Sequence, residues 1–287
     1  MEVQQQNDSY QKKGYLTDDY RVFYLEENET KEYESHYHDF DKLIFFMKGN
    51  VKYTIEGKTY ELLPEDVVLV PHGDVHKVEI EKSMPYERLV IYLSPQYLLQ
   101  WKKKGADLSE CFLRAKDAYA NVIRFHNRQD KLYQLAKQLK STIMQNKEEK
   151  MAPLLQETWV LQFLIFLNRA MQAEHITYVD SACRNIKIVE MIRYINSHLT
   201  EEISIDGLSQ QFYISRYHMM RQFKNETGYS IGSYISNKRL LYARELIRQG
   251  EPVTKVCFDC GFREHSTFNR AYKQLFGVTP IKSREED

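Results

Sequence analysis

Three histidines in the first third of the chain have a spacing that can bring their imidazoles together. His36 and His38 are separated by one residue, and His76 follows the apolar run DVVLV. Alternate residues of a β-strand point to the same side, so His36 and His38 can face an interior that His76 reaches from a second strand. Three neutral imidazoles suit zinc, iron or nickel, and they also suit a small-molecule pocket. The pattern therefore indicates a metal site, an effector pocket, or a set of polar groups at strand edges.

A second group of residues whose side chains could bind a partner lies in the stretch GFREHSTFNRAYKQLFGVTP, near the C-terminus. Phe268, Tyr272 and Phe276 recur every four residues, so on a helix they share one side and enter a core. The residues that remain on the outer side include His265, Ser266, Asn269, Arg270 and Lys273. Arginine side chains donate paired hydrogen bonds of the kind that base edges in a DNA major groove accept. The alternative is a solvated helix face that carries an incidental arginine.

An earlier stretch, SIDGLSQQFYISRYHMMRQFKNETG, follows the same plan as PVTKVCFDCGFREHSTFNRAYKQLFG. Each has a short helix, a tight break, and a longer helix with a central aromatic residue followed by lysine. In the earlier copy Met219 and Phe223 face inward. Tyr217, Met220, Arg221 and Lys224 are expected on the outer side. The sequence therefore predicts two helix-turn-helix units.

A helix of about 20 residues, from Ser230 to Gln249, joins the two units and would be roughly 30 Å long. Successive major-groove faces on one side of B-DNA lie roughly 34 Å apart. The spacing therefore predicts that both units contact one turn of duplex.

The overall charge hides a difference between the two ends of the chain. The 287 residues contain 40 Lys and Arg and 40 Asp and Glu, a formal net charge of zero. From Cys183 onward there are 16 basic and 12 acidic residues, a net charge of +4, which leaves −4 for the preceding 182 residues. A basic C-terminal third is compatible with a nucleic-acid partner, although the average charge of the chain is not.

The elements that must position these residues fall into an α+β arrangement. Residues 17–93 consist of short β-branched and aromatic runs separated by turn signals, with a hairpin expected at Glu56-Gly57, and predict a β-barrel or sandwich. Helical periodicity follows, and the polar stretch His175–Asn185 is expected to be a linker. We expect a barrel over residues 1–110, a helical dimerisation segment over 111–178, and an all-α domain with two helix-turn-helix units over 179–287.

The C-terminal runs closely resemble the second helix-turn-helix of AraC-type transcription regulators. The resemblance is carried by VTKVCFDCGF and STFNRAYKQLFGVTP, with matches at Val256, Gly261, Phe262, Ser266, Phe268, Arg270, Tyr272, Lys273, Gly277, Thr279 and Pro280, while Arg239, Leu240 and Ala243 resemble the linker helix. It implies a module that inserts two recognition helices into adjacent major grooves of a promoter, attached to an N-terminal effector-binding or dimerisation domain. Carried over by position, Arg221 and Arg270 read bases.

The N-terminal histidines resemble those of the cupin barrel, in which H-x-H and a later P-x-G-x-x-H hold a metal. Cupin enzymes commonly have a glutamate about four residues after the second histidine, and Lys42 occupies that position here. A cation pointing inward would repel a metal, so we expect no metal or other cofactor and instead a small-molecule pocket. Its expected lining is His36, His38, His76, Tyr24, Phe46, Tyr53 and Tyr92. Family resemblance favours a sugar or aromatic effector.

Together these features predict a transcription regulator that is not an enzyme. Its expected partners are double-stranded promoter DNA, a small-molecule effector, RNA polymerase and a second copy of the chain. The polar start MEVQQQNDSYQKKG, the short apolar run WVLQFLIFL and only four cysteines favour a cytoplasmic protein without a membrane partner. Two alternatives are a metal-dependent cupin enzyme using His36, His38 and His76, and a DNA-bending protein with no effector.

Overall fold

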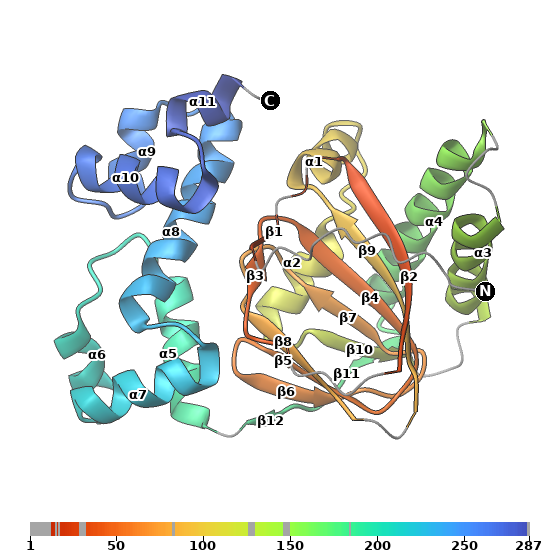
Figure 1. Cartoon of the computed structure of the whole chain (residues 1–287), viewed down its shortest axis with the longest axis horizontal. Helices are drawn as coiled ribbons and strands as arrows, with labels where there is room; N and C mark the ends of the chain where they lie inside the picture. Colours follow the sequence, from red (N-terminus) through yellow and green to blue (C-terminus); the bar gives the residue numbers. More distant parts are fainter. Residues whose placement is uncertain are drawn as a thin grey trace. The chain divides into compact units, whose positions relative to one another are not determined.

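The computed structural model describes residues 13–14, 16, 18–28, 33–81, 84–125, 130–145, 150–183 and 185–285. The chain divides into two compact units, Met1–Ala182 and Cys183–Asp287 (Figure 1). The first unit contains β-sheets with helices, and the second is helical. The predicted α+β class, with a cupin-like first unit and an all-α second unit, is confirmed.

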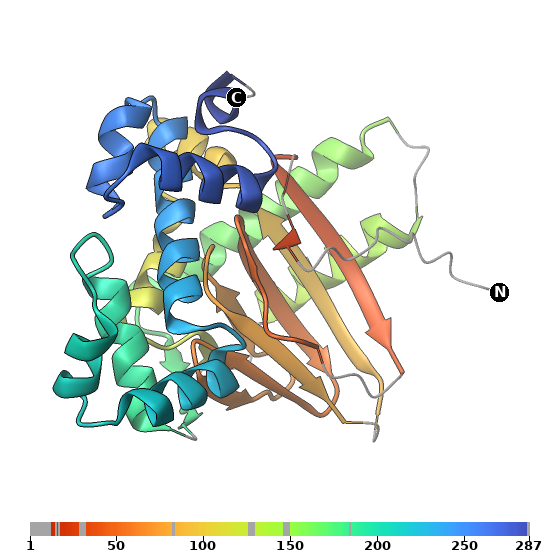
Figure 2. The same cartoon turned by 60° about the vertical axis from the view of Figure 1, so that its left-hand side comes forward.

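The first unit contains a six-stranded sheet with the order β11-β10-β7-β4-β9-β2. Its strands are β2 (Tyr20–Glu27), β4 (Asp41–Lys48), β7 (Val67–Val70), β9 (Tyr86–Leu93), β10 (Val122–Phe125) and β11 (Ile176–Tyr178). Figure 2 shows β2, β9 and β4 side by side, and each of these pairs is antiparallel. The sheet places alternate residues on two faces, one toward each of two cores.

A second sheet faces the six-stranded sheet across the interior of the first unit. It includes β6 (Lys58–Glu61), β5 (Val51–Ile55) and β8 (His76–Ile80), in that order, and β12 (Ala182–Cys183) lies at the division between the two units. The predicted hairpin at Glu56-Gly57 is confirmed, because β5 and β6 pair across these residues with φ of 48° and 79°. Two positive φ angles are typical of a type I′ turn, which matches the strand twist.

A short parallel pair joins β1 (Lys13–Gly14), which precedes β2, to β3 (Tyr37–His38), which follows it. Beside it, an isolated antiparallel bridge joins His36 to His76 at the start of β8. These two pairings bring the histidine segment His36–His38 against the barrel wall.

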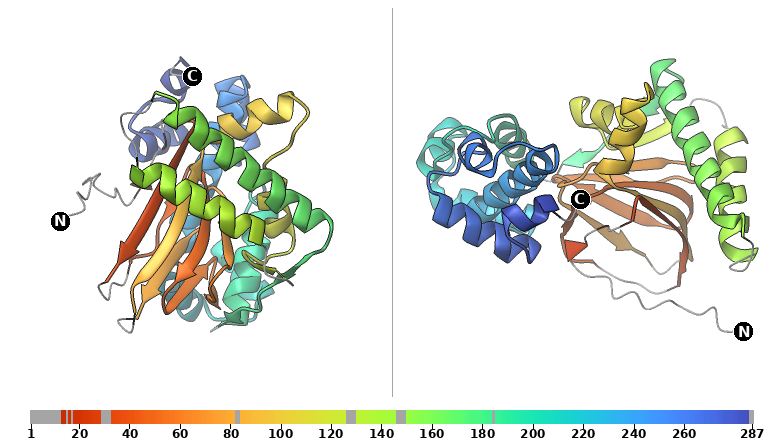
Figure 3. Two further views of the ribbon diagram at one scale, coloured as in Figure 1. Left: turned by 90° about the vertical axis from the view of Figure 1, so that its right-hand side faces the viewer. Right: turned by 90° about the horizontal axis from the view of Figure 1, so that it is seen from above.

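One apolar core fills the space between the sheets, and another lies between the six-stranded sheet and the helices. The inner core includes Phe46, Tyr53 and Tyr92, and the outer core includes Leu43, Phe45 and Phe163. The helices of the unit are α1 (Pro95–Lys103), α2 (Glu110–Asp117), α3 (Asp130–Gln145) and α4 (Ala152–Gln172). The left view of Figure 3 shows α3 and α4 lying across one face of the sheet.

The apolar run WVLQFLIFL forms part of α4 and buries Val160, Phe163, Leu164 and Leu167, as expected of a packed helix. In the part of the chain that the structure describes, we find no helix of the length and apolarity needed to cross a bilayer.

The range 111–178 is not wholly helical. It supplies β10 and β11, which pair with each other, and β10 also pairs with β7 of the barrel sheet. The linker expected over His175–Asn185 therefore contains a strand of this sheet. The division of the chain into three parts stays a prediction, since the compact units are 1–182 and 183–287.

The second unit contains seven helices among its described residues. They are α5 (Ile186–Ser197), α6 (Ile205–Gln211), α7 (Arg216–Thr227), α8 (Ile231–Arg248), α9 (Val253–Asp259), α10 (His265–Phe276) and α11 (Pro280–Glu285). The hydroxyl of Ser204 accepts a hydrogen bond from the Gly207 amide at the start of α6. Gly228 and Gly277 end α7 and α10 in the left-handed conformation, where glycine has no Cβ to clash. The two helix-turn-helix units are α6–α7 and α9–α10, and α8 lies between them (Figure 1).

Candidate functional site

The outer face of α7 carries the residues that the sequence assigned to it. Met219 and Phe223 are fully buried, and they anchor the helix in the core of the unit. Tyr217 is 77% exposed and Met220 is 48% exposed, while Arg221 and Lys224 are also exposed. Arg216, the first residue of the helix, forms an ion pair with Asp206 of α6. The helix therefore presents an aromatic ring, a thioether and cations to solvent.

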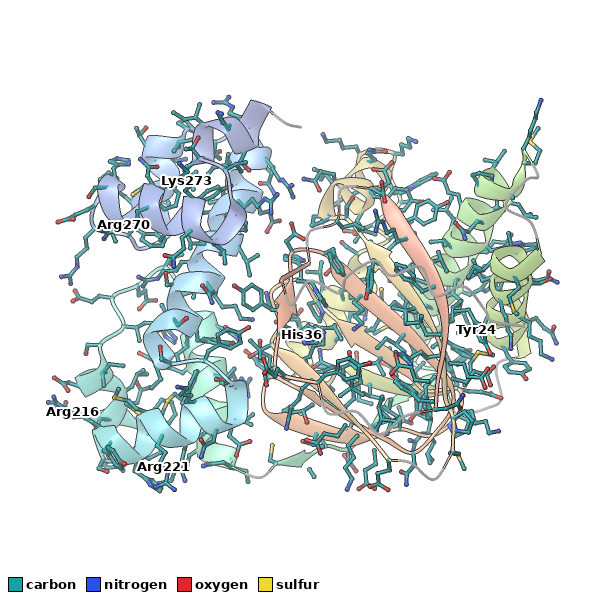
Figure 4. The ribbon with its side chains drawn as sticks, in the orientation of Figure 1. Tyr24, His36, Arg216, Arg221, Arg270 and Lys273 are labelled. Carbon is teal, nitrogen blue, oxygen red and sulfur yellow. The ribbon has the colours of Figure 1, made fainter. Side chains whose placement is uncertain are left out.

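The outer face of α10 is similar. Phe268 and Tyr272 are fully buried, and the hydroxyls of Tyr272 and Ser283 lie 2.9 Å apart, which ties α10 to α11. Ser266, Asn269, Arg270 and Lys273 are exposed (Figure 4 labels Arg270 and Lys273). The helix has no acidic residue within its bounds. Its exposed face is therefore cationic and rich in hydrogen-bond donors.

His265 departs from its predicted position. It begins α10 and is half-buried, because its ring packs edge-on against Phe258 of α9 with the ring centroids 4.9 Å apart. The exposed side chain of Phe258 is the reason that this histidine is less available than Ser266.

Arg221 and Arg270 are available for an external partner. Among the described residues, neither guanidinium has a hydrogen bond, ion pair or ring contact. Figure 4 shows Arg221 on α7 and Arg270 on α10 at opposite ends of α8. With 18 residues, α8 is about 27 Å long, close to the length expected from the sequence.

Arg239 of α8 links the two helix-turn-helix units. Its guanidinium donates hydrogen bonds to the carbonyl oxygens of Leu199, Glu201 and Gly261. The first two acceptors lie between α5 and α6, and Gly261 lies in the turn between α9 and α10. One side chain therefore ties the segment before the first unit and the turn of the second unit to the linker helix. Sequence reasoning found Arg239 only by resemblance, because a guanidinium that bridges three backbone carbonyls leaves no local pattern.

The three predicted histidines converge in the first unit. His36, His38 and His76 each have a ring nitrogen within 4.8 Å of the others, and all three residues are at least 92% buried. The ring centroids of His36 and His76 lie 4.4 Å apart. Nδ1 of His36 lies 2.9 Å from the Glu34 carbonyl oxygen, and Nδ1 of His76 lies 3.0 Å from that of Asp74. We call these three residues the histidine cluster.

The histidine cluster is electrically neutral at physiological pH. Burial, followed by the positive charge of Lys42, lowers the pKa of His36 to about 4. Burial followed by Lys42 also holds the pKa values of His38 and His76 well below the usual range. Desolvation disfavours the charged imidazolium, which explains the common direction.

Aromatic rings surround the histidine cluster. The ring of Tyr53 stacks on His76 with centroids 6.0 Å apart, and the ring of Phe40 stacks on His38 at 4.5 Å. Tyr92 contacts Phe40 at 4.4 Å. Phe40 was not among the predicted residues, although its position two residues after His38 places it on the same side of an extended chain.

Lys42 points inward, as the sequence argument against a metal supposed. It is 5% exposed, and its Nζ lies 5.9 Å from the ring centroids of both Tyr53 and Tyr92. The barrel therefore places a cation beside the histidine cluster.

The structure does not bring the other two predicted lining residues to the histidine cluster. Phe46 is fully buried in the same inner core but packs against Tyr86, near the far end of β4. The hydroxyl of Tyr24 donates to Glu87 and accepts from Lys140 of α3, at 2.8 Å and 2.7 Å. Tyr24 thus faces the helices, away from His36 (Figure 4), and its prediction as a lining residue is corrected.

Two family models match the chain. One, described as the AraC-like ligand binding domain, covers residues 20–164, and the other, described as a helix-turn-helix domain, covers residues 208–286. The first match alone spans half of the chain and contains the histidine cluster. The chain belongs to the AraC family. Its two exposed helices, α7 and α10, both lie within the residues that the helix-turn-helix match covers.

Individual known proteins resemble all or part of the chain. The HTH-type transcriptional activator RhaS of Escherichia coli strain SMS-3-5 / SECEC is 25% identical over 261 residues, which cover 88% of each chain. The solved structure of ToxT from Vibrio cholerae is 12% identical, with a TM-score of 0.37, and the match covers 94% of this chain and 99% of ToxT. A protein of unknown function from Listeria innocua is 27% identical, with a TM-score of 0.33, over 34% of this chain and 94% of that one.

Proposed function

We propose that this AraC-family chain is a sequence-specific transcription regulator that inserts α7 and α10 into successive major grooves of promoter DNA. The observation that carries the proposal is that both helices bury an aromatic anchor and expose an arginine with no partner among the described residues. Arg221 and Arg270 donate to base edges, with Tyr217, Met220, Ser266 and Asn269 beside them. Lys224 and Lys273 contact phosphates, and His265 supports the start of α10.

The histidine cluster and its aromatic surround form the effector-binding part of the proposed regulator. Rings that stack on buried polar groups favour a small molecule with an apolar face and a few hydrogen-bonding groups, such as a sugar or an aromatic compound. Effector binding changes the activity of the regulator only if the effector binds one arrangement of the two DNA-binding units more tightly than another. RhaS is named as a transcriptional activator, and we propose that this chain likewise activates transcription in the cytoplasm and contacts RNA polymerase.

A second copy of the chain completes the proposed regulator. The helix α4 exposes Leu154 and Ile165, and Met151 is exposed just before the helix, with exposed fractions of 61%, 43% and 65%. Leu154 and Ile165 are eleven residues apart, about three helical turns, so they lie on one face. We propose that this face pairs two chains.

The enzyme alternative has less support. A cupin enzyme would need a metal in the histidine cluster and an acidic group to assist it, and the inward side chain at the expected position is the cation of Lys42. The regulator also accounts for the paired arginine-bearing helices, which an enzyme would leave without a role.

The proposal is tested by measuring affinity for a selected operator and for random-sequence DNA at fixed salt. Arg221→Ala and Arg270→Ala are expected to weaken operator binding by about 1–3 kcal/mol each and random binding little, because base contacts discriminate sequence. Lys273→Ala should weaken both alike, because phosphates carry no sequence information.

Arg114→Ala serves as the matched control, since it removes the same charge from an exposed ion pair on α2 of the first unit. It should change neither affinity. Equal losses on operator and random DNA for the two arginine variants would contradict their assignment as base readers.

A further inference from the structure

The two exposed helices of the second unit follow one plan, so their outward positions can be compared one by one. Both α7 and α10 contain 12 residues, and each ends at a glycine in the left-handed conformation. When the helices are aligned on their first residues, Met219 coincides with Phe268, and both are fully buried. Phe223 coincides with Tyr272 in the same way. Each outward position of α7 therefore has a counterpart on α10.

Two of the outward pairs are alike. Arg221 of α7 coincides with Arg270 of α10, and both side chains are exposed. Lys224 coincides with Lys273, and these are exposed as well. The two helices therefore present the same arrangement of positive charge to a partner, and their cations do not distinguish one from the other.

Two other outward pairs differ in chemistry. Tyr217 coincides with Ser266, and Met220 coincides with Asn269. Tyr217 is 77% exposed and Met220 is 48% exposed, which gives α7 a largely apolar flank. Ser266 and Asn269 are also exposed, and they give α10 a hydroxyl and an amide at the same places. The two recognition faces therefore differ beside their arginines.

The differing side chains lie next to the arginine on each helix. Tyr217, Met220 and Arg221 have the spacing i, i+3 and i+4, which places them on one helical surface. One helical turn rises about 5.4 Å, and successive bases of a strand are about 3.4 Å apart. An arginine placed on a guanine therefore brings its flanking side chains to the adjacent base pairs.

The flank of α7 is suited to thymine. The thioether of Met220 has no donor and is only a weak acceptor. The C5-methyl of thymine is the apolar group of the major groove, whereas the other base edges carry donors and acceptors that a thioether would leave unpaired. The ring of Tyr217 has no hydrogen bond or ring contact among the described residues, so it is available to cover the same methyl group.

The flank of α10 is suited to adenine. The amide of Asn269 presents a donor and an acceptor side by side, which match N7 and the N6 amino group of adenine. The hydroxyl of Ser266 donates or accepts as the neighbouring base requires. Within the part of the chain that the structure describes, neither side chain has a hydrogen-bond partner. Both are therefore available to bases.

We infer that the operator of this chain consists of two unlike major-groove elements. Guanine lies beside thymine in the element under α7, and guanine lies beside adenine in the element under α10. The inference rests on the proposed function and deepens it by naming the bases. The centres of the two elements are about 10 base pairs apart. Because the two helices read different base edges, one chain binds its operator in one direction only.

The experiment begins by selecting an operator from random-sequence duplexes with the full chain at fixed salt. The element whose recognition is lost in Arg221→Ala is assigned to α7, and the element whose recognition is lost in Arg270→Ala is assigned to α10. Base analogues are then placed one position at a time, and the affinity is measured by fluorescence anisotropy.

Deoxyuridine in place of the contacted thymine removes only the C5-methyl group. In the α7 element it should weaken binding about fourfold, as expected for one buried methyl group. In the α10 element 7-deazaadenine removes the N7 acceptor and should weaken binding about fivefold, as expected for one lost hydrogen bond. Each analogue should have little effect in the other element.

Exchanged side chains test whether the named residues cause these effects. Tyr217→Ser combined with Met220→Asn gives α7 the flank of α10 and should abolish the deoxyuridine effect. Asn269→Met should abolish the 7-deazaadenine effect. Met144→Asn is the matched control, because Met144 is 62% exposed on α3 of the first unit, and it should retain both effects.

The possible outcomes separate this inference from the proposed function. An operator that depends on both arginines but tolerates both analogues would overturn the inference and leave the proposed function intact. The same holds if the exchanged α7 keeps its full sensitivity to deoxyuridine. A selection that enriches no sequence at all would overturn the proposed function, and the inference with it.

Discussion

The buried histidine cluster links protonation to the stability of the first unit. His36 has a folded-state pKa of about 4, lowered mainly by burial and then by Lys42, against 6.5 in its ordinary state. Above pH 6.5 both the folded and unfolded states are neutral, and this group contributes nothing. Between pH 6.5 and about 4 only the unfolded state binds the proton, so the folded state loses stability as the pH falls.

We therefore expect the free energy of unfolding of the first unit to fall between pH 7 and pH 4.5, with His36 responsible for about 3 kcal/mol at most. His38, His76 and Lys42 lie around the His36 imidazole. Burial, followed by the charge of Lys42, also lowers the pKa values of His38 and His76, so these two histidines add to the loss of stability at low pH. Urea unfolding with a chelator present, compared between the unaltered chain and His36→Gln, measures this part separately from the carboxylates. An equally steep pH dependence in both proteins would contradict the assignment.

Gly261 shows how a single residue is constrained by its neighbours. Its φ of +79° is strained for other residues, and a Cβ would lie 2.8 Å from the Arg239 guanidinium carbon and 3.0 Å from the Thr200 carbonyl oxygen. We expect Gly261→Ala to destabilise the second unit by about 2–4 kcal/mol, part from the left-handed backbone and part from displacing Arg239. Urea denaturation measures the loss.

Gly277→Ala is the control, because Gly277 has the same φ of +79° and no neighbouring atom within 4 Å of the added Cβ. It should show only the backbone cost, about 1 kcal/mol. Equal destabilisation by both substitutions would mean that the close approach of Arg239 to Gly261 does not contribute to the free energy of unfolding.

At the scale of elements, α4 combines a packed side with an exposed apolar side. Phe163, Leu164 and Leu167 are fully buried against the sheet, whereas Leu154 and Ile165 remain exposed. Exposed apolar residues that share one face often mark an interaction surface.

Leu154→Glu and Ile165→Glu are expected to shift the chain from dimer to monomer, because each places a charge in the proposed interface. Sedimentation or light scattering at several protein concentrations measures the mass. Leu113→Glu is the control, since Leu113 is 49% exposed on a different helix, α2. A mass unaffected by the α4 substitutions would contradict pairing through α4.

At the scale of the whole molecule, the two units have separate cores and opposite charge. The first 182 residues carry a net charge of −4 and the remainder +4. Within the second unit, Ile188, Met191, Phe223, Phe268 and Tyr272 are all fully buried. A unit with its own core is expected to fold alone.

We expect a fragment covering residues 183–287 to be helical and to unfold cooperatively. Circular dichroism during thermal unfolding tests this, and the same fragment carrying Phe223→Ala should melt at a lower temperature because a large core side chain is lost. A fragment that unfolds without a cooperative transition would contradict an independent second unit.

Much of the second unit could be predicted from local sequence. The four-residue recurrence of Phe268, Tyr272 and Phe276 determines which side of α10 is buried, and therefore that Arg270 is exposed. Helix periodicity acts over a few residues, so its consequences are readable without a fold. His265 was less predictable, because Phe258 of another helix covers it.

In the first unit, long-range pairing decided what local patterns left open. The sequence determined that His36, His38 and His76 could converge, but only the bridge between His36 and His76 brings together residues forty positions apart. Tyr24 was assigned to the wrong face because a shift of one residue along β2 exchanges the two sides, and the register opposite Leu89 turns it toward the helices. Strand partners, and with them the facing of each side chain, depend on hydrogen bonds between distant segments, which a single stretch of sequence does not contain.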